Sequence, residues 1–362
     1  MKKSNLINVD YRNLPSYPNI IHYLENLREK RDKHLLLGNG FSMSYDPSIF
    51  SYNALSKFID KLDNDILHKL FDIVKTNNFE SVMQQLDNFS KIAVIFGASK
   101  RFVEKIDQAT VTLKESLINA VKELHPEHVF TIEEKRSKIC ASFLNYFIEN
   151  GGNIFTTNYD LLLYWVLMRN ESIVNKTDGF GRDAEESFEF VPADEVKYSE
   201  LRWGKYKEEQ NIHYLHGALP LFDTGLEIVK EEYTDEHYLL ANIEERFDKK
   251  EYPIFVTAGN GNDKLTHIMH NRYLTFCYEK LSTIMGSLIT YGFNFGEYDE
   301  HIIEAINKAT TLREDETGKL NKLCSVYIGV YSEADFEHIK SIEAKFKCKV
   351  NVFDVKTTNV WG

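Results

Sequence analysis

The feature that most constrains the fold is a run of three leucines that leads directly into a glycine-bracketed turn. Residues 33–42 read Lys-His-Leu-Leu-Leu-Gly-Asn-Gly-Phe-Ser. An uninterrupted apolar run is typical of a strand that is buried on both faces, as in parallel sheets. Glycines at positions 38 and 40 let a ligand approach the main chain closely. The stretch therefore predicts a buried strand and a turn whose backbone N–H groups hold an anion such as phosphate. A tight turn without a ligand is the alternative, because neither the dinucleotide fingerprint nor the P-loop is complete.

Short apolar runs recur in the second half of the chain, and helical patterns separate them. Strands that are separated by helices of this kind imply crossover connections and a mostly parallel sheet. The expected fold class is therefore α/β, with a Rossmann-like, mostly parallel sheet flanked by helices. The expected strands after the first are residues 153–156, 212–215, 254–256, 288–291, 325–328 and 349–353.

Between the first and second strands the sequence changes character. Residues 52–150 are rich in helix formers and poor in β-branched runs, which predicts a large all-helical insertion. We expect one domain over residues 1–362. Its parts are an N-terminal arm and helix at 1–30, a Rossmann-like core at 31–45 and 150–362, and the helical insertion at 46–149.

Composition limits the partners of the chain. With a net charge of −12, the 362 residues offer no broad basic surface, which argues against direct nucleic-acid binding but not against an anionic dinucleotide. No apolar run follows the N-terminal lysines, and no window approaches the roughly 20 apolar residues of a membrane span. The cysteines are scattered, so we expect no cysteine zinc module and a cytoplasmic location. They are Cys140, Cys277, Cys324 and Cys348.

A second polar cluster, Thr-Thr-Asn-Tyr-Asp at residues 156–160, follows the strand at 153–156. Ligands bind at the C-terminal ends of strands in open parallel sheets, so these side chains are candidates for a binding site. Capping of a helix that begins at Leu161 is the alternative, and it accounts for one of these residues.

Two further clusters also follow predicted strands. His216 and Gly217 come after the strand at 212–215, and the glycine leaves room beside an imidazole that could act as a general base or bind a ribose hydroxyl. His213 is expected to be structural. In the loop at 292–299, an asparagine at position 294 offers hydrogen bonds to a ribose or adenine. The alternative is a loop whose Asp299 caps the next helix.

Taken together, these clusters resemble the sirtuin superfamily. Sirtuins carry Gly-Ala-Gly-x-Ser, Thr-Gln-Asn-x-Asp and His-Gly after successive strands, and the counterparts here are residues 38–42, 156–160 and 216–217 in the same order. These motifs look like those of bacterial sirtuin-like proteins of anti-phage defence, which have Gly-Asn-Gly-Phe-Ser, Thr-Thr-Asn-Tyr-Asp and Leu-His-Gly as here. Those are mostly NAD⁺ hydrolases that deplete the cofactor and abort infection, and several act with a HerA-type ATPase. The four-cysteine zinc module of the deacylases is missing, which argues against deacylation.

The resemblance implies hydrolysis of the nicotinamide–ribose bond of NAD⁺, with Asn158 and His216 as catalytic residues and no metal. It also implies a homo-oligomer and a HerA-type ATPase as a possible partner. An NAD⁺- or ADP-ribose-sensing module without turnover and a nuclease component of a defence complex stay open as alternatives. The residues expected to bind NAD⁺ are Gly38, Asn39, Gly40, Phe41, Ser42, Thr157, Asp160, Gly292 and Asn294.

Overall fold

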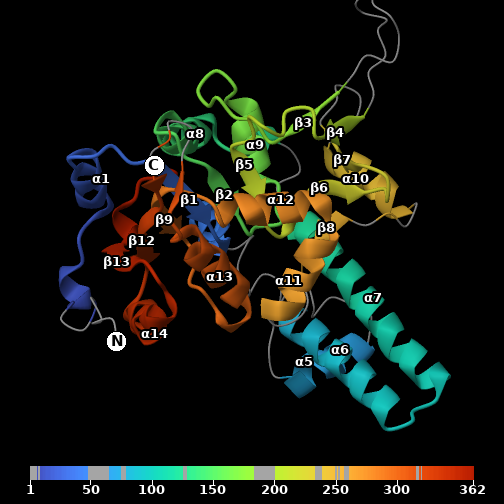
Figure 1. The fold of residues 1–362 in the computed structure, drawn as a ribbon. Coiled ribbons are helices and arrows are strands. Elements are labelled where there is room, and N and C mark those ends of the chain that lie inside the picture. Colours follow the sequence, from blue (N-terminus) through green and yellow to red (C-terminus); the bar gives the residue numbers. More distant parts are fainter. Residues whose placement is uncertain are drawn as a thin grey trace, which may run out of the picture.

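A six-stranded sheet forms the centre of the protein in the computed structural model (Figure 1). All neighbouring strands in it are parallel, in the order β13-β12-β9-β1-β2-β5. The strands are β1 (Lys33–Leu37), β2 (Ile154–Thr156), β5 (Ile212–Tyr214), β9 (Gly286–Tyr291), β12 (Leu323–Val330) and β13 (Lys349–Asp354). The structure describes residues 6, 9–47, 65–74, 79–124, 129–182, 200–232, 239–248, 251, 253–256, 261–314, 318 and 320–362.

The leucine run is a central strand, as its sequence predicts. Leu35 is opposite Ile154 on one side and Ile289 on the other, and all five residues of β1 are buried. A strand that is buried on both faces needs apolar side chains at consecutive positions, which explains why the run does not alternate with polar residues. The predicted α/β fold with a mostly parallel sheet is confirmed.

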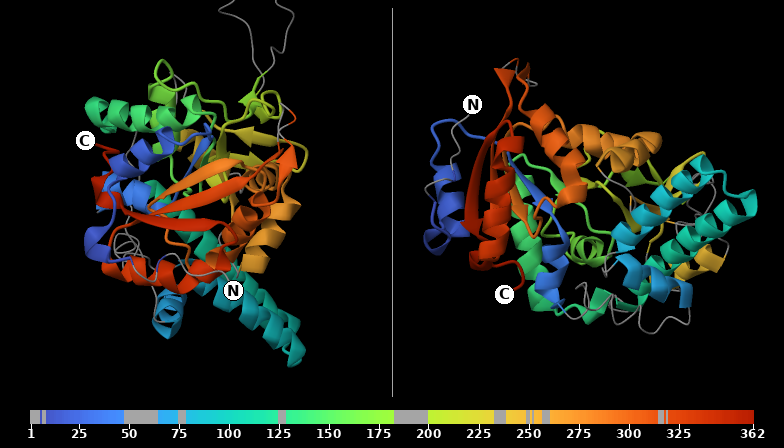
Figure 2. Two further views of the ribbon diagram at one scale, coloured as in Figure 1. Left: turned by 60° about the vertical axis from the view of Figure 1, so that its left-hand side comes forward. Right: turned by 90° about the horizontal axis from the view of Figure 1, so that it is seen from below.

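Helices pack against both faces of this sheet and around its ends (Figure 2). The last residues of the chain return to the first helix after β1, where Trp361 Nε1 donates to the carbonyl of Phe41 at 3.2 Å. No helix in the described ranges is both long and apolar enough to cross a membrane. The helices outside the segment treated below are α1 (Tyr17–Glu25), α2 (Asn39–Tyr45), α8 (Glu134–Glu149), α9 (Leu162–Arg169), α10 (Leu239–Asp248), α11 (Gly261–His270), α12 (Arg272–Leu281), α13 (Glu300–Ala309) and α14 (Glu333–Ile342).

A second, antiparallel sheet was not expected from the sequence. Its order is β3-β4-β7-β6-β8. The strand predicted at 254–256 belongs here and not in the parallel sheet, so that assignment was wrong. The connection of β6 to β7 is too short for a crossover helix, and a short connection forces neighbouring strands to run antiparallel. The strands are β3 (Phe180–Gly181), β4 (Leu201–Trp203), β6 (Gly217–Asp223), β7 (Ile228–Lys230) and β8 (Pro253–Phe255), with a separate short pair of β10 (Arg313–Glu314) and β11 (Leu320–Asn321).

Three helices between β1 and β2 form a separate unit that extends from the body of the molecule (Figure 1). They are α5 (Asp65–Val74), α6 (Phe79–Ile95) and α7 (Lys100–Leu124). The expected insertion at 46–149 also includes α8, but the apolar side chains of α8 pack into the main core beside β1 and β2. Helical periodicity alone does not indicate which core a helix joins. Residues 48–64, 75–78 and 125–128 of this stretch lie outside the described residues. The unit has a core of its own, made of Leu67, Phe71, Val82, Met83, Leu86, Ala93, Ile106 and Leu113.

Candidate functional site

The polar clusters follow the C-terminal ends of three neighbouring strands, β1, β2 and β5, and backbone hydrogen bonds connect these ends. The N–H of Thr157, just after β2, donates to the carbonyl of Leu37 at the end of β1, at 3.1 Å. The N–H of Leu215, just after β5, donates to the carbonyl of Thr156 at 2.9 Å. The clusters that follow β1, β2 and β5 therefore share one edge of the parallel sheet, although more than 170 residues separate the first from the last.

Three glycines bring the loops after β1 and β9 into direct backbone contact. The N–H of Gly40 donates to the carbonyl of Gly292 at 2.9 Å. A Cβ atom built on Gly38 would lie 2.5 Å from the Gly292 carbonyl oxygen, and one built on Gly40 would lie 2.5 Å from the Gly292 Cα. Only glycine fits in such a contact, so the sequence signal at 38 and 40 has a structural cause.

This contact uses N–H groups that were expected to bind an anion. Gly38 donates to Tyr291 O at 3.0 Å, Gly40 donates to Gly292, and Phe41 donates to Gly38 O at 2.9 Å. These three N–H groups are therefore unavailable to a phosphate in this conformation. Asn39 has an exposed side chain, and its own N–H is the first of α2, where no partner exists inside the helix. The glycines of this loop therefore serve close packing of the main chain more than they provide a row of N–H donors for an anion.

The amide of Asn158 is held in one orientation at this edge. Its Nδ2 donates to the carbonyl of Gly38 at 3.1 Å and to Ser42 Oγ at 3.0 Å. A carbonyl only accepts hydrogen bonds, so the nitrogen must face Gly38 and the amide cannot be flipped. Among the described residues, no group donates to Asn158 Oδ1. The residue thus offers a fixed, unoccupied acceptor beside the glycine loop.

Asp160 takes part in the polar network at the strand ends and also accepts a hydrogen bond from the first turn of α9. Its Oδ2 accepts a hydrogen bond from Ser42 Oγ at 2.6 Å, and its Oδ1 accepts one from the N–H of Leu162 at 2.9 Å, at the start of α9. Burial raises the pKa of the Asp160 carboxyl, and the bonds from Ser42 and Leu162 partly lower it again. Both oxygens are therefore engaged, and Asp160 holds Ser42, which in turn holds Asn158.

His216 contacts Tyr159, the residue between Asn158 and Asp160. The Tyr159 ring stacks on the imidazole with 6.3 Å between ring centroids, and the Tyr159 hydroxyl donates to Val256 O at 2.8 Å. Val256 in turn donates its N–H to the carbonyl of His216 at 3.0 Å. Asn158, Tyr159 and His216 therefore belong to one continuous set of contacts.

The imidazole of His216 faces a second histidine that the sequence did not indicate. The Nε2 atoms of His216 and His301 are 2.8 Å apart, a hydrogen bond in which one ring donates to the other. Burial lowers the pKa of His216 well below its usual value, with His301 and Lys264 adding to the effect, and burial with Lys264 lowers the pKa of His301 to about 3. Both rings are therefore neutral near pH 7.

Asp299 completes this group. It stands at the N-cap position of α13, as expected, but its carboxylate caps no backbone N–H there. Its Oδ1 lies 3.4 Å from the ammonium of the buried Lys264 in α11. His301 is two residues further on in α13. No local pattern in the sequence links these residues to His216, because 85 positions separate the two histidines.

The remaining candidates are placed as follows. Thr157 donates its hydroxyl to Leu37 O at 3.4 Å, close to Asn158. Asn294 is exposed in the loop after β9, two residues beyond Gly292. His213 is fully buried, stacks on Phe155 and faces Asn153 Oδ1 at 3.0 Å, so it has the structural surroundings that its position suggests.

The four cysteines are free thiols. Three of them lie in α8, α12 and β12, and the fourth directly precedes β13. They are Cys140, Cys277, Cys324 and Cys348.

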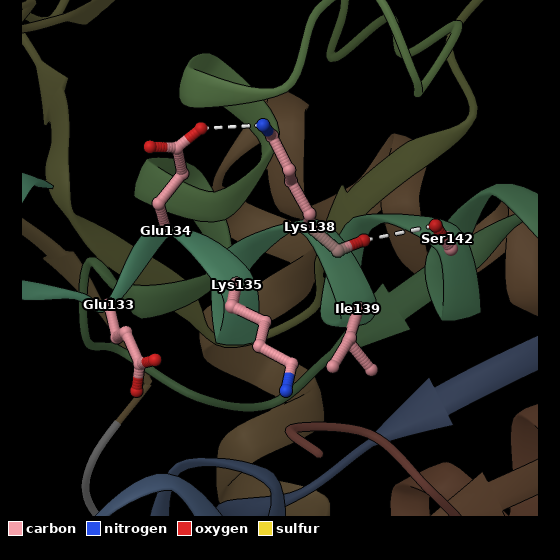
Figure 3. Close-up of a pocket in the computed structure, with 6 residues that line it drawn as sticks. All are labelled: Glu133, Glu134, Lys135, Lys138, Ile139 and Ser142. Atoms are coloured by element: carbon pink, nitrogen blue, oxygen red, sulfur yellow. Dashed lines mark hydrogen bonds and ion pairs between the residues drawn. The ribbon is translucent and has the colours of Figure 1, made fainter.

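A hollow of about 580 Å³ lies over the outer side of α8 (Figure 3). Glu134 and Lys138 form an ion pair there at 2.5 Å, a solvent-facing contact one helical turn apart. A smaller hollow of about 200 Å³ lies where Tyr164 of α9 and Lys230 of β7 approach each other. None of the residues predicted to bind NAD⁺ lines either hollow. The lining of the first is Glu133, Glu134, Lys135, Lys138, Ile139 and Ser142.

Comparison with known proteins gives a family but no activity. No curated protein matches the sequence. The model of one family, described as a domain of unknown function (DUF4917), matches residues 35–361. This match begins inside β1, includes every other strand of both sheets and ends at Trp361. The chain therefore belongs to the DUF4917 family.

Proposed function

We propose that this protein is an NAD⁺ glycohydrolase that releases nicotinamide and ADP-ribose. The observation that carries the proposal is the side chain of Asn158, whose nitrogen is tied to Gly38 and Ser42 while its oxygen is left open at the strand ends. Such a group suits a reaction in which positioning matters more than nucleophilic strength.

NAD⁺ already carries a cationic leaving group, so cleavage of its N-glycosidic bond passes through an oxocarbenium-like state. The enzyme has to hold the ribose, admit a water molecule to one face and stabilise positive charge. In the proposal, Asn158 Oδ1 accepts a hydrogen bond from that water or from a ribose hydroxyl. Asn158 as a whole residue is 8% exposed, so bulk water competes little at this position.

His216 contributes a neutral imidazole in this scheme. Because its pKa is lowered well below the usual value, it is a poor general base near pH 7, and a hydrogen bond to a ribose hydroxyl is the role we assign to it. Ser42 and Asp160 act as positioning residues, since they touch Asn158 or each other and hold the amide in place.

The biological setting follows the resemblance to sirtuin-like defence proteins. In that setting NAD⁺ is consumed in the cytoplasm during abortive infection, and activity is switched on by oligomerisation or by a HerA-type ATPase. Control of this kind is needed because uncontrolled loss of NAD⁺ is lethal to the cell.

A matched pair of asparagine variants tests the site. Asn158→Ala removes the open acceptor, whereas Asn170→Ala removes a buried amide that bonds to Ser137 and Val166 away from the strand ends. Nicotinamide release is measured for the purified full-length chain, alone and with a HerA-type ATPase. We expect Asn158→Ala to lose about 100-fold or more in rate, as for the loss of one well-placed polar group in an active site, while Asn170→Ala keeps its activity if folded.

The alternatives give different results in the same experiment. Binding of NAD⁺ without release of nicotinamide by any assembly would favour a sensing module. Cleavage of added DNA with NAD⁺ left intact would favour a nuclease component. Equal activity of the two asparagine variants would remove Asn158 from the mechanism.

A further inference from the structure

The group formed by His216, His301 and Asp299 has the composition of a metal site. Each residue offers one ligand atom, and the three atoms lie within 4.8 Å of one another. Both imidazoles are nearly or fully buried, with exposed fractions of 3% for His216 and 1% for His301. We propose that these three side chains bind a divalent transition metal ion, zinc by the chemistry of the donors.

The donor set favours zinc over a harder cation. Two neutral imidazole nitrogens and one carboxylate oxygen are typical ligands of zinc, whereas magnesium and calcium prefer oxygen alone. In a tetrahedral zinc site, two nitrogens each about 2.05 Å from the metal would lie roughly 3.3 Å apart. The two Nε2 atoms here are 2.8 Å apart, so they need to separate by only about half an ångström.

The protein does not complete the hydrogen bonding of these rings by itself. The Nδ1 atom of His301 is buried, and no hydrogen-bond partner is described for it. The two rings share a single hydrogen bond through their Nε2 atoms. A metal ion would take one Nε2 lone pair from each ring. The proton that the two Nε2 atoms now share would move to the Nδ1 atom of the ring that donates it, so both imidazoles would stay neutral.

Lys264 opposes the metal, which gives the proposal a sharp test. Its ammonium lies 3.4 Å from Asp299 Oδ1 and 2% of its side chain is exposed, so its charge is poorly screened. Removing this charge should strengthen metal binding, whereas general damage to the fold would weaken it. A variant with improved affinity therefore distinguishes a metal site from a merely structural cluster.

This inference does not rest on the proposed NAD⁺ hydrolysis. The metal would bind the Nε2 atom of His216, which now takes part in the hydrogen bond to His301. Metal binding is measured directly, without substrate, so failure of one proposal leaves the other standing.

The test starts from full-length protein freed of metal by a chelator. Zinc is titrated in competition with a chromophoric chelator, and bound zinc is counted by mass spectrometry after desalting. We expect one zinc ion per chain. His301→Gln and Asp299→Asn should each lose roughly tenfold or more in affinity, and Lys264→Gln should gain affinity. His267→Gln, which removes an exposed histidine of α11, should bind as the wild type does.

Substitution with Co²⁺ provides a measurement that needs no variant. A visible spectrum typical of low coordination by nitrogen and oxygen ligands, without thiolate absorption, is expected for the wild-type protein. The proposal is overturned if the wild type retains no stoichiometric zinc and shows no such spectrum. It is also overturned if a folded His301→Gln binds zinc as tightly as the wild type.

Discussion

Replacement of Gly292 by alanine tests the backbone contact on which the strand-end site is built. Gly292 has a φ of +66°, and a Cβ atom there would lie 2.5 Å from the Cα of Gly40 and 2.6 Å from the N of Phe41. These neighbours are backbone atoms, which cannot rotate away as the end of a flexible side chain would. Gly292→Ala must therefore either strain the loop or push the turn after β1 out of place.

Two terms set the size of the effect. An alanine at positive φ costs about 1–2 kcal/mol relative to glycine, and forcing extra volume into a packed contact costs about 1–3 kcal/mol more. Gly292→Ala should thus lower the free energy of unfolding by about 2–5 kcal/mol, a large share of the roughly 5–15 kcal/mol of a typical protein.

Gly225→Ala is the matched control. Gly225 has a φ of +82°, but a Cβ atom there, in the turn between β6 and β7, would have no heavy atom within 4 Å. This variant should lose only the conformational term, about 1–2 kcal/mol. Urea denaturation followed by circular dichroism measures both. If the two variants differ by less than about 0.5 kcal/mol, within ordinary scatter for surface changes, the argument from backbone contact is refuted.

Three further predictions concern buried polar groups. Burial lowers the pKa of His34 to about 4 from 6.5, so its contribution to stability is complete above pH 6.5 and is lost as the pH falls from 6.5 toward 4. The loss is about 3 kcal/mol for a difference of roughly 2.5 pKa units. It should be missing from the pH profile of His34→Gln and present in that of the exposed His22→Gln. Burial raises the pKa of Asp160, so the ionised carboxylate disfavours folding as the pH rises above 3.8. In urea titrations, the stability of Asp160→Asn relative to the wild type should therefore increase between pH 3.8 and neutrality. Trp361→Phe removes the indole N–H that donates to Phe41 O, which should lower the free energy of unfolding by about 1–2 kcal/mol. Amide hydrogen exchange in α2 should become faster. Unchanged exchange there would show that the C-terminus does not hold this helix.

The parallel sheet could be predicted because its strands carry a strong local signal. Buried parallel strands favour short apolar runs such as the three leucines of β1, and each of the six strands overlaps a segment that the sequence assigns to a strand. The antiparallel sheet was missed because its order depends on which strands pair, including strands far apart in the sequence such as β4 and β7, and periodicity does not express this relation. The strand at 253–255 has the same apolar character as the others, and only its neighbours decide which sheet it joins.

The candidate site was predictable in part for a related reason. Residues that follow buried strands gather at one edge of a parallel sheet, so the grouping of Gly38, Asn158 and His216 could be inferred from position alone. His301 and Asp299 could not, since their nearness to His216 depends on how α13 packs against α11 and α12. The side-chain hydrogen bonds could not be predicted from the sequence either. They changed the interpretation of Asp160 from a ligand-binding group to one that holds Ser42.

Product analysis of NAD⁺ treated with the purified chain tests the central claim most directly. Chromatography with mass detection separates the products of each possible bond cleavage. The account predicts nicotinamide and ADP-ribose in equal amounts, formed by the wild-type protein and not by Asn158→Ala. Intact NAD⁺ after incubation with the assembled protein and a HerA-type ATPase, or cleavage at the pyrophosphate instead of the nicotinamide–ribose bond, would contradict it.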